Sequence, residues 1–129
     1  MDELQKQIDE AKRQIAELEK LAALVREHNL FVLCDEAYFD IRYAGKSTSF
    51  ASLPDMAERS IILYTFSKKF AMTGWRLGAS VGPKEIIDVI AKLNVNDESC
   101  PNHFIQYGAI EGLTGDQTEV QQILDTLKQ

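Results

Sequence analysis

Three short apolar runs, and the unequal lengths of chain between them, constrain the fold of this chain most strongly. The runs are Leu30–Cys34, Ile61–Phe66 and Arg76–Val81, each with the length of a β-strand. The first is wholly apolar, as expected of a strand covered on both faces, and Gly78 in the third suggests a close approach to the backbone. A long link joins the first two runs and suits a right-handed parallel crossover, whereas the shorter second link favours an antiparallel return. We therefore predict an α/β fold with a small three-stranded mixed sheet, two strands parallel and one antiparallel.

About five helices are expected to flank this sheet. Residues 1–29 are expected to form one long N-terminal helix, because apolar residues recur there in a heptad-like stripe. The stripe consists of Leu4, Ile8, Ala11, Ile15, Leu18, Ala22 and Val25. Such a helix would reach on the order of 40 Å, much further than a short strand, so we expect it to overhang the sheet. The other helical segments are expected around Leu53–Arg59, from Pro83 to Leu93, from Pro101 to Leu113 and over Thr118–Lys128.

The composition is typical of a globular protein of one domain. The chain has 129 residues, of which 45% are hydrophobic and 26% charged, and one modest core is expected at this length. The formal net charge of −6 argues against nucleic acid as a partner, since that requires a broad basic surface. No membrane partner is expected, because no apolar run has the length of a membrane span. Cys34 and Cys100 lack metal-ligand spacing, so we expect free thiols, no metal site and a reducing, cytoplasmic setting.

Reactive side chains gather where the predicted strands end. Asp35 follows the first strand, Thr65, Ser67 and Lys68 lie at the end of the second, and Arg76 opens the third. Because ligands of open α/β sheets bind beyond the carboxyl ends of parallel strands, this topology brings the five residues to one edge. An amine, a guanidinium and two hydroxyls suit a phosphorylated aldehyde. The amine can form an imine with the aldehyde, and the other groups can hold the phosphate.

Each of these residues also has an ordinary structural explanation. The acidic pair Asp35–Glu36 is typical of a solvated turn, and the lysine pair Lys68–Lys69 of an exposed surface. Tyr38 is equally typical of the rim of a core. Only the spacing of the whole set favours a cofactor site.

The stretch Thr65–Gly78, TFSKKFAMTGWRLG, resembles the cofactor-lysine signature of the class I/II (fold-type I) pyridoxal-phosphate-dependent aminotransferases. The similarity extends upstream to LFVLCDEAY, which is Leu30–Tyr38. Downstream, CPNHFIQYGAIEGLTGDQ is similar to the helix that follows the cofactor segment. These landmarks recur in the family's order over roughly residues 17–129. The resemblance therefore implies a fragment of the large domain of such an enzyme.

The resemblance implies a role for each candidate residue. Lys68 would be the catalytic lysine that binds pyridoxal 5'-phosphate covalently. Asp35 falls at the position of the family residue that pairs with the pyridine nitrogen of the cofactor. Tyr38 falls at the position of the family residue that contacts the ring hydroxyl. The positions that bind the phosphate correspond to Thr65, Ser67 and Arg76.

The chain also departs from the family's pattern. Thr65 stands where a serine is common, and Ala71 where a glycine is common. The family's phosphate loop, stacking aromatic, ring-oxygen asparagine and substrate-carboxylate arginine have no counterpart here. Residues 1–16 do not resemble the sequence that precedes this segment in the family. Their regular heptads suggest a designed or grafted helix, and a natural amphipathic helix is the alternative. We therefore divide the single domain 1–129 into a helix extension, 1–16, and an aminotransferase-like subdomain, 17–129.

Three functional hypotheses follow. In the first, the chain is an engineered or excised aminotransferase subdomain that keeps the cofactor-lysine segment without full transaminase activity. Full activity is not expected, because orientation of the substrate can contribute roughly 7–11 kcal/mol to catalysis. In the second, the chain is a structural or designed fold without a ligand. In the third, it is an association module that pairs with itself through exposed strand edges or the N-terminal heptad helix.

Overall fold

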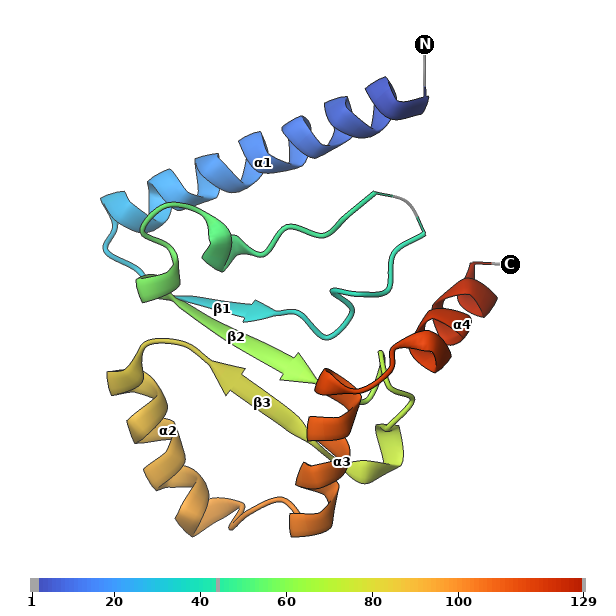
Figure 1. Cartoon of the computed structure of the whole chain (residues 1–129). Helices are drawn as coiled ribbons and strands as arrows, with labels where there is room; N and C mark the ends of the chain where they lie inside the picture. The colour runs from blue at the N-terminus through green and yellow to red at the C-terminus, as the bar shows by residue number, and fades with distance from the viewer. Residues whose placement is uncertain (1–2, 44, 129) are drawn as a thin grey trace.

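A computed structural model describes residues 3–43 and 45–128 (Figure 1). Over these residues the chain forms four α-helices and three strands. They are α1 (Glu3–Glu27), β1 (Val32–Asp35), β2 (Ser60–Thr65), β3 (Gly78–Val81), α2 (Lys84–Asp97), α3 (His103–Thr114) and α4 (Thr118–Leu127). Short 3-10 helices lie at Phe50–Ser52, Ala57–Arg59 and Thr73–Trp75. The α/β class and the long N-terminal helix are confirmed, while the helix predicted around Leu53–Arg59 is only a 3-10 turn.

The sheet has the predicted mixed topology. β1 pairs with β2 in parallel, with Cys34 opposite Ile62, and β2 pairs with β3 in antiparallel fashion, with Leu63 opposite Ser80. The central strand is therefore β2, and β1 and β3 form the two edges (Figure 1). The long link gave the parallel pair and the short link gave the antiparallel pair, as the spacing predicted.

Gly78, at the start of β3, lies very close to the neighbouring strand. A Cβ atom here would come within 2.9 Å of the carbonyl oxygen of Tyr64, a separation that real Cβ atoms essentially never show. The close approach predicted for this glycine is therefore to the backbone of β2. It allows the start of β3 to lie tightly against the end of β2.

The C-terminal half of α1 packs on the sheet. Ala22 and Val25 are buried in one hydrophobic cluster with side chains from the link between β1 and β2. The partners in that link are Phe50, Leu53 and Met56. The helix ends at Glu27, beyond which Asn29 adopts a left-handed conformation with φ 48° and the N–H of Leu30 donates to the carbonyl of Val25 at 2.9 Å. This is a common way for a helix to end.

The N-terminal half of α1 overhangs the sheet, as predicted (Figure 1). Leu4, in the heptad-like stripe, is 62% exposed, and Ile8 and Ile15 are also exposed. The same stripe is buried further along the helix, at Ala22 and Val25. The apolar stripe is therefore longer than the surface on which α1 packs.

The prediction that the first strand is covered on both faces is wrong. Val32 and Cys34 pack against the cluster under α1, and burial raises the pKa of the Cys34 thiol. Leu33, which points to the opposite face, is 64% exposed. Successive side chains of a strand alternate between the two faces, and α1 packs on only one of them.

A second hydrophobic cluster holds the loop between β2 and β3. Phe66 and Leu77, at the two ends of this loop, are buried together with Ala109 of α3. The rings of Phe66 and Phe70 stack with their centroids 5.7 Å apart. The described residues thus form two clusters of buried side chains instead of the single core expected, and the second anchors the loop on both sides of Lys68.

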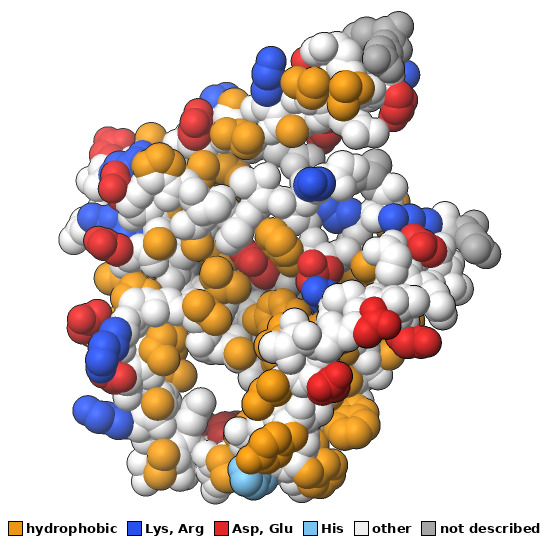
Figure 2. Space-filling view, viewed as in Figure 1, with side chains coloured by type: hydrophobic (Ala, Val, Ile, Leu, Met, Phe, Trp, Pro, Cys, Tyr) orange, Lys and Arg blue, Asp and Glu red, His pale blue; other side chains and the backbone are white. Residues whose placement is uncertain are grey.

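The remaining helices leave much apolar surface exposed. Neither α2 nor α4 contains a fully buried residue. Exposed apolar side chains on α2 and α3 include Val89, Leu93, Phe104 and Tyr107. Hydrophobic side chains are accordingly spread over the face seen in Figure 2. Even so, none of the described helices is long and apolar enough to cross a membrane.

Candidate functional site

The ends of β1 and β2 meet at one edge of the sheet, and the start of β3 lies beside them. Asp35 is the last residue of β1, and Thr65 is the last residue of β2. Beyond the antiparallel ladder, the N–H of Phe66 donates to the carbonyl of Leu77 at 3.3 Å. Because Arg76 immediately precedes Leu77, the topology carries it to the same edge as Thr65.

Lys68 is half-buried in the turn after β2. Its Nζ lies 5.2 Å from the centroid of the Tyr38 ring, which is a cation–π distance. Tyr38 belongs to the turn after β1 and is itself exposed. One residue further on, Nζ of Lys69 lies 3.5 Å from Oδ2 of Asp40. The turns that follow the two parallel strands therefore contact each other at two points.

Hydrogen bonds close the loop from Thr65 to Arg76 on itself. The N–H of Ser67 donates to Oγ1 of Thr65 at 3.2 Å, and the hydroxyl of Thr73 donates to the carbonyl of Ser67 at 3.1 Å. Nη1 of Arg76 donates to the carbonyl of Thr73 at 3.1 Å. A guanidinium has five N–H donors, and a hydroxyl that accepts a bond can still donate one. The loop can therefore offer a cation and hydroxyl donors to an anion.

Two residues of this loop have a left-handed backbone. Ala71 has φ 52° and Arg76 has φ 54°. This region is unfavourable for residues other than glycine, and such strain persists where the surrounding structure imposes it. Strained residues are concentrated at active sites and ligand clamps, so the pair supports this loop as a candidate site.

The carboxylate of Asp35 lies at the exposed end of β1. Its Oδ1 accepts a hydrogen bond from the N–H of Ala37 at 3.1 Å, which shapes the turn that leads to Tyr38. In the part of the chain that the structure describes, neither Asp35 nor Arg76 forms a hydrogen bond or ion pair with Lys68. The predicted site residues thus share one edge of the sheet without forming one bonded network.

A cavity of about 570 Å³ opens beside Asp35 and Tyr38, on the side of α1. Arg42, further along the link between β1 and β2, also lines it. Lys68 is not among the lining residues, and its contact with the Tyr38 ring connects it to this cavity. The structure therefore places Asp35 and Tyr38 at one cavity, and Lys68 contacts the ring of Tyr38 without lining that cavity.

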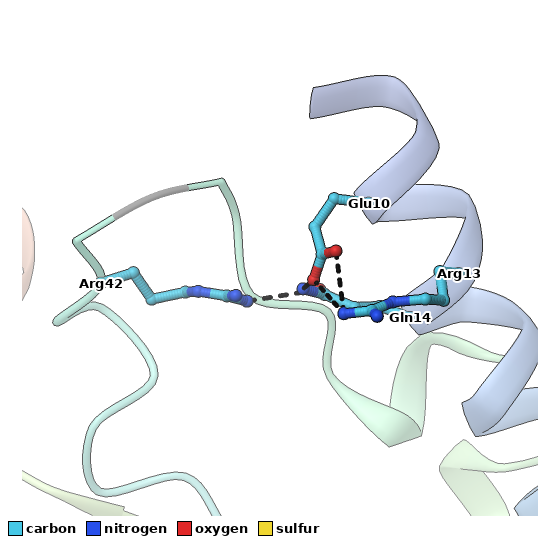
Figure 3. A network of polar contacts seen from close by, with 4 residues as sticks. All are labelled: Glu10, Arg13, Gln14 and Arg42. Atoms are coloured by element: carbon cyan, nitrogen blue, oxygen red, sulfur yellow. Dashed lines mark hydrogen bonds and ion pairs between the residues drawn. The ribbon is translucent and has the colours of Figure 1, made fainter. Parts of the chain in front are cut away.

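A polar network that the sequence pattern does not predict joins α1 to this cavity (Figure 3). Glu10 accepts hydrogen bonds from Gln14 at 2.9 Å and from Arg13 at 3.2 Å, and these bonds lower the pKa of the Glu10 carboxyl. Gln14 in turn accepts a bond from Nη1 of Arg42 at 3.3 Å. The spacings of three and four within α1 are a readable helical signal. The partner Arg42 lies far along the chain, and nothing in the sequence pattern points to it.

The donor set at this edge fits a phosphorylated aldehyde. The half-buried residue Lys68 supplies an amine, and the loop supplies a guanidinium and hydroxyls. Among residues 3–43 and 45–128, no group of three or more His, Cys, Asp or Glu side chains is arranged to hold a metal ion.

Known proteins are similar in sequence to this chain over most of its length. The model of the family "Aminotransferase class I and II" matches residues 13–129. The putative aminotransferase YugH of Bacillus subtilis is 37% identical over 107 residues, which cover 83% of this chain and 28% of that protein. An aspartate aminotransferase of Pyrococcus abyssi is 43% identical over 103 residues, which cover 79% of this chain and 26% of that protein. The chain thus spans little more than a quarter of the length of these relatives.

Solved structures share the fold as well. The aromatic aminotransferase of Pyrococcus horikoshii matches with a TM-score of 0.81 at 40% identity, over 85% of this chain and 30% of that one. The aspartate aminotransferase of Thermus thermophilus with maleate matches with a TM-score of 0.77 at 32% identity, over 86% of this chain and 28% of that one.

Proposed function

Because the chain belongs to the class I and II aminotransferase family, we propose that it forms the cofactor-lysine part of an aminotransferase active site. In this proposal Lys68 holds pyridoxal 5'-phosphate. One observation supports it above the others: Nζ of the half-buried residue Lys68 lies 5.2 Å from the centroid of the Tyr38 ring, and the loop that carries Lys68 also carries hydroxyl and guanidinium donors. A phosphorylated aldehyde needs this combination of groups.

Lys68 would act as the nucleophile toward the aldehyde carbon, through its unprotonated Nζ. Arg76 would bind the phosphate through the guanidinium N–H groups that Thr73 leaves free. Hydroxyls of Ser67 and Thr65 would donate to the same phosphate. Since the bond from Ser67 N–H to Thr65 holds the two residues together, their hydroxyls can serve one anion.

Asp35 and Tyr38 would set the electronic state of the bound ring. The Asp35 carboxylate would pair with a protonated pyridine nitrogen, and the Tyr38 hydroxyl would donate to the ring oxygen. Pyridoxal phosphate, when bound, supplies an electron sink for reactions at the α-carbon of an amino acid. Asp35 and Tyr38 line a cavity of about 570 Å³ that Lys68, Thr65, Ser67 and Arg76 do not line, so this cavity bears only on the ring end of the ligand.

By itself, the chain is proposed to bind the cofactor without complete transamination. The stacking aromatic and the substrate-carboxylate arginine that the resemblance implies have no counterpart among its residues. The hypothesis that residues 1–16 are a grafted helix stays a prediction, with a natural helix as its alternative. The family match begins at residue 13, so it includes the last four residues of that predicted extension, and the prediction for residues 1–12 stays untested.

A cofactor titration tests the proposal. Pyridoxal phosphate should bind the wild-type chain saturably and shift the cofactor's visible absorption, whereas Lys68→Ala should abolish this shift. Arg76→Ala should weaken binding about tenfold or more, because hydrogen bonds to charged groups each contribute roughly 1.5–3 kcal/mol. Lys84→Ala is the matched control, since this exposed lysine pairs with Asp88 on α2, away from the site.

Pyridoxal, which lacks the phosphate, separates the two roles. It should bind wild type and Arg76→Ala with similar weak affinity. If wild type, Lys68→Ala and Lys84→Ala titrate alike, the proposal is wrong and the structural fold without a ligand is the better account.

Self-association through α1 is a second candidate function. The exposed stripe at Leu4, Ile8 and Ile15 favours it, because an apolar stripe with heptad spacing is suited to a second helix. A second copy of the chain would present the same stripe. In this alternative the chain associates with itself whether or not the cofactor is bound.

A further inference from the structure

Two neighbouring lysines contact the same turn. Lys68 lies over the Tyr38 ring at 5.2 Å, and Lys69 lies 3.5 Å from the carboxylate of Asp40. The two partners are only two residues apart in the turn after β1. The turn after β2 is therefore held against the turn after β1 by a pair of adjacent contacts.

The ion pair between Lys69 and Asp40 is the most shielded one in the described part of the chain. Its side chains are 24% and 33% exposed, whereas in every other ion pair there both partners are more than 40% exposed. Water and salt screen a shielded pair less than an exposed one. This pair is thus the one best able to maintain a fixed geometry.

Lys69 is also tied to the hydrophobic cluster beneath the loop. Its Nζ lies 5.3 Å from the centroid of the Phe70 ring, and Phe70 stacks on the buried Phe66. A side chain held by both Asp40 and Phe70 has little freedom to turn. Because Lys68 is the preceding residue, its backbone is constrained by the same contacts.

We propose that Lys69 and Asp40 are positioning residues: their ion pair clamps the turn after β2 onto the turn after β1 and keeps Nζ of Lys68 over the Tyr38 ring. The effect of this ion pair on cofactor binding rests on the proposed function. The clamp itself is a property of the chain without cofactor. A lysine held in place before the aldehyde arrives loses less conformational freedom on reaction.

The clamp can be measured by NMR on the cofactor-free chain. Nuclei above an aromatic ring resonate upfield, so the Cε–Hε signal of Lys68 should be shifted upfield in wild type relative to Tyr38→Leu. Asp40→Asn and Lys69→Gln should each reduce this shift, because each removes one partner of the ion pair. Backbone amide spectra of both variants show whether the fold is retained.

A charge swap distinguishes the ion pair from the size of the side chains. The double variant Asp40→Lys, Lys69→Asp restores opposite charges across the same two turns, and it should recover most of the upfield shift. Asp88→Asn is the matched control, since it breaks a lysine–aspartate pair on α2 and should leave the Lys68 signal unchanged. The proposal is overturned if the single variants keep the wild-type signal, or if the swap fails to restore it.

A trapping experiment links the clamp to the proposed function. At a subsaturating concentration of pyridoxal phosphate, borohydride should attach the cofactor to Lys68 about two- to fivefold less in Asp40→Asn than in wild type, the range expected from loss of one ion pair. Equal trapping in both would overturn the positioning role in cofactor binding. If wild type traps none, the proposed function fails, and the NMR comparison still decides whether the clamp exists.

Discussion

Ala71 holds a backbone conformation that alanine rarely adopts. Its φ of 52° lies in the left-handed region, where the Cβ atom is too close to the following carbonyl oxygen. The resemblance places a glycine at this position, and glycine has no such penalty. The left-handed turn after Lys68 therefore explains why glycine is common at this position in the family. In this chain an alanine adopts the same left-handed conformation.

Ala71→Gly is therefore expected to stabilise the protein. Relief of the left-handed strain should outweigh the greater freedom of glycine in the unfolded chain and raise the free energy of unfolding by roughly 0.5–1 kcal/mol. Urea denaturation of both proteins measures the change. Ala91→Gly, the same substitution inside the helix α2, should lower the free energy of unfolding by about 1 kcal/mol. A loss of stability in both variants would contradict this account of Ala71.

At the residue scale, the sequence identifies reactive groups better than their partners. Lys68, Arg76 and the hydroxyls of Thr65 and Ser67 could be selected because they are close in the sequence and resemble a family signature. The ion pair between Lys69 and Asp40 could not, because both residue types are usually exposed and nothing in their spacing relates them. Contacts between distant side chains depend on how two turns meet, and only the folded chain shows this.

Among the elements, β3 lies close to β2 at a glycine at each end, Gly78 and Gly82. Gly78→Ala would place a Cβ atom 2.9 Å from the carbonyl oxygen of Tyr64, and the backbone of a central strand has little room to move. We expect the free energy of unfolding to fall by roughly 1–3 kcal/mol, as for other overpacked sites. Gly74→Ala is the control, since a Cβ there meets nothing within 4 Å. Equal effects of the two substitutions in urea denaturation would count against this explanation.

The helix α1 carries the prediction of self-association. Sedimentation at several concentrations should show reversible dimers if the exposed stripe pairs with a second copy. The double variant Ile8→Asp, Ile15→Asp should remain monomeric because it places charges within the stripe. Ala16→Asp, Ala23→Asp adds the same charges on another face of the helix and should still dimerise. A wild-type chain that stays monomeric at every concentration rules out this pairing.

On the scale of the whole molecule, the strand order was predictable and the coverage of the sheet was not. The lengths of the links between apolar runs were enough to predict which strands are parallel, because crossovers need many residues and hairpins few. The apolar run around Leu33 predicts a strand covered on both faces, and this prediction is wrong because composition shows which residues can be buried and not what covers them. The two separate clusters of buried residues reflect the same open arrangement.

The account as a whole depends on Lys68 as the residue that holds the cofactor. Pyridoxal phosphate and then borohydride should be added to the wild-type chain and to Lys68→Ala, and proteolytic peptides should be weighed by mass spectrometry. The account predicts one cofactor-sized mass increase, confined to the peptide that contains Lys68 and absent from the variant. A mass increase spread over several lysines, or the same labelling in Lys68→Ala, would contradict it.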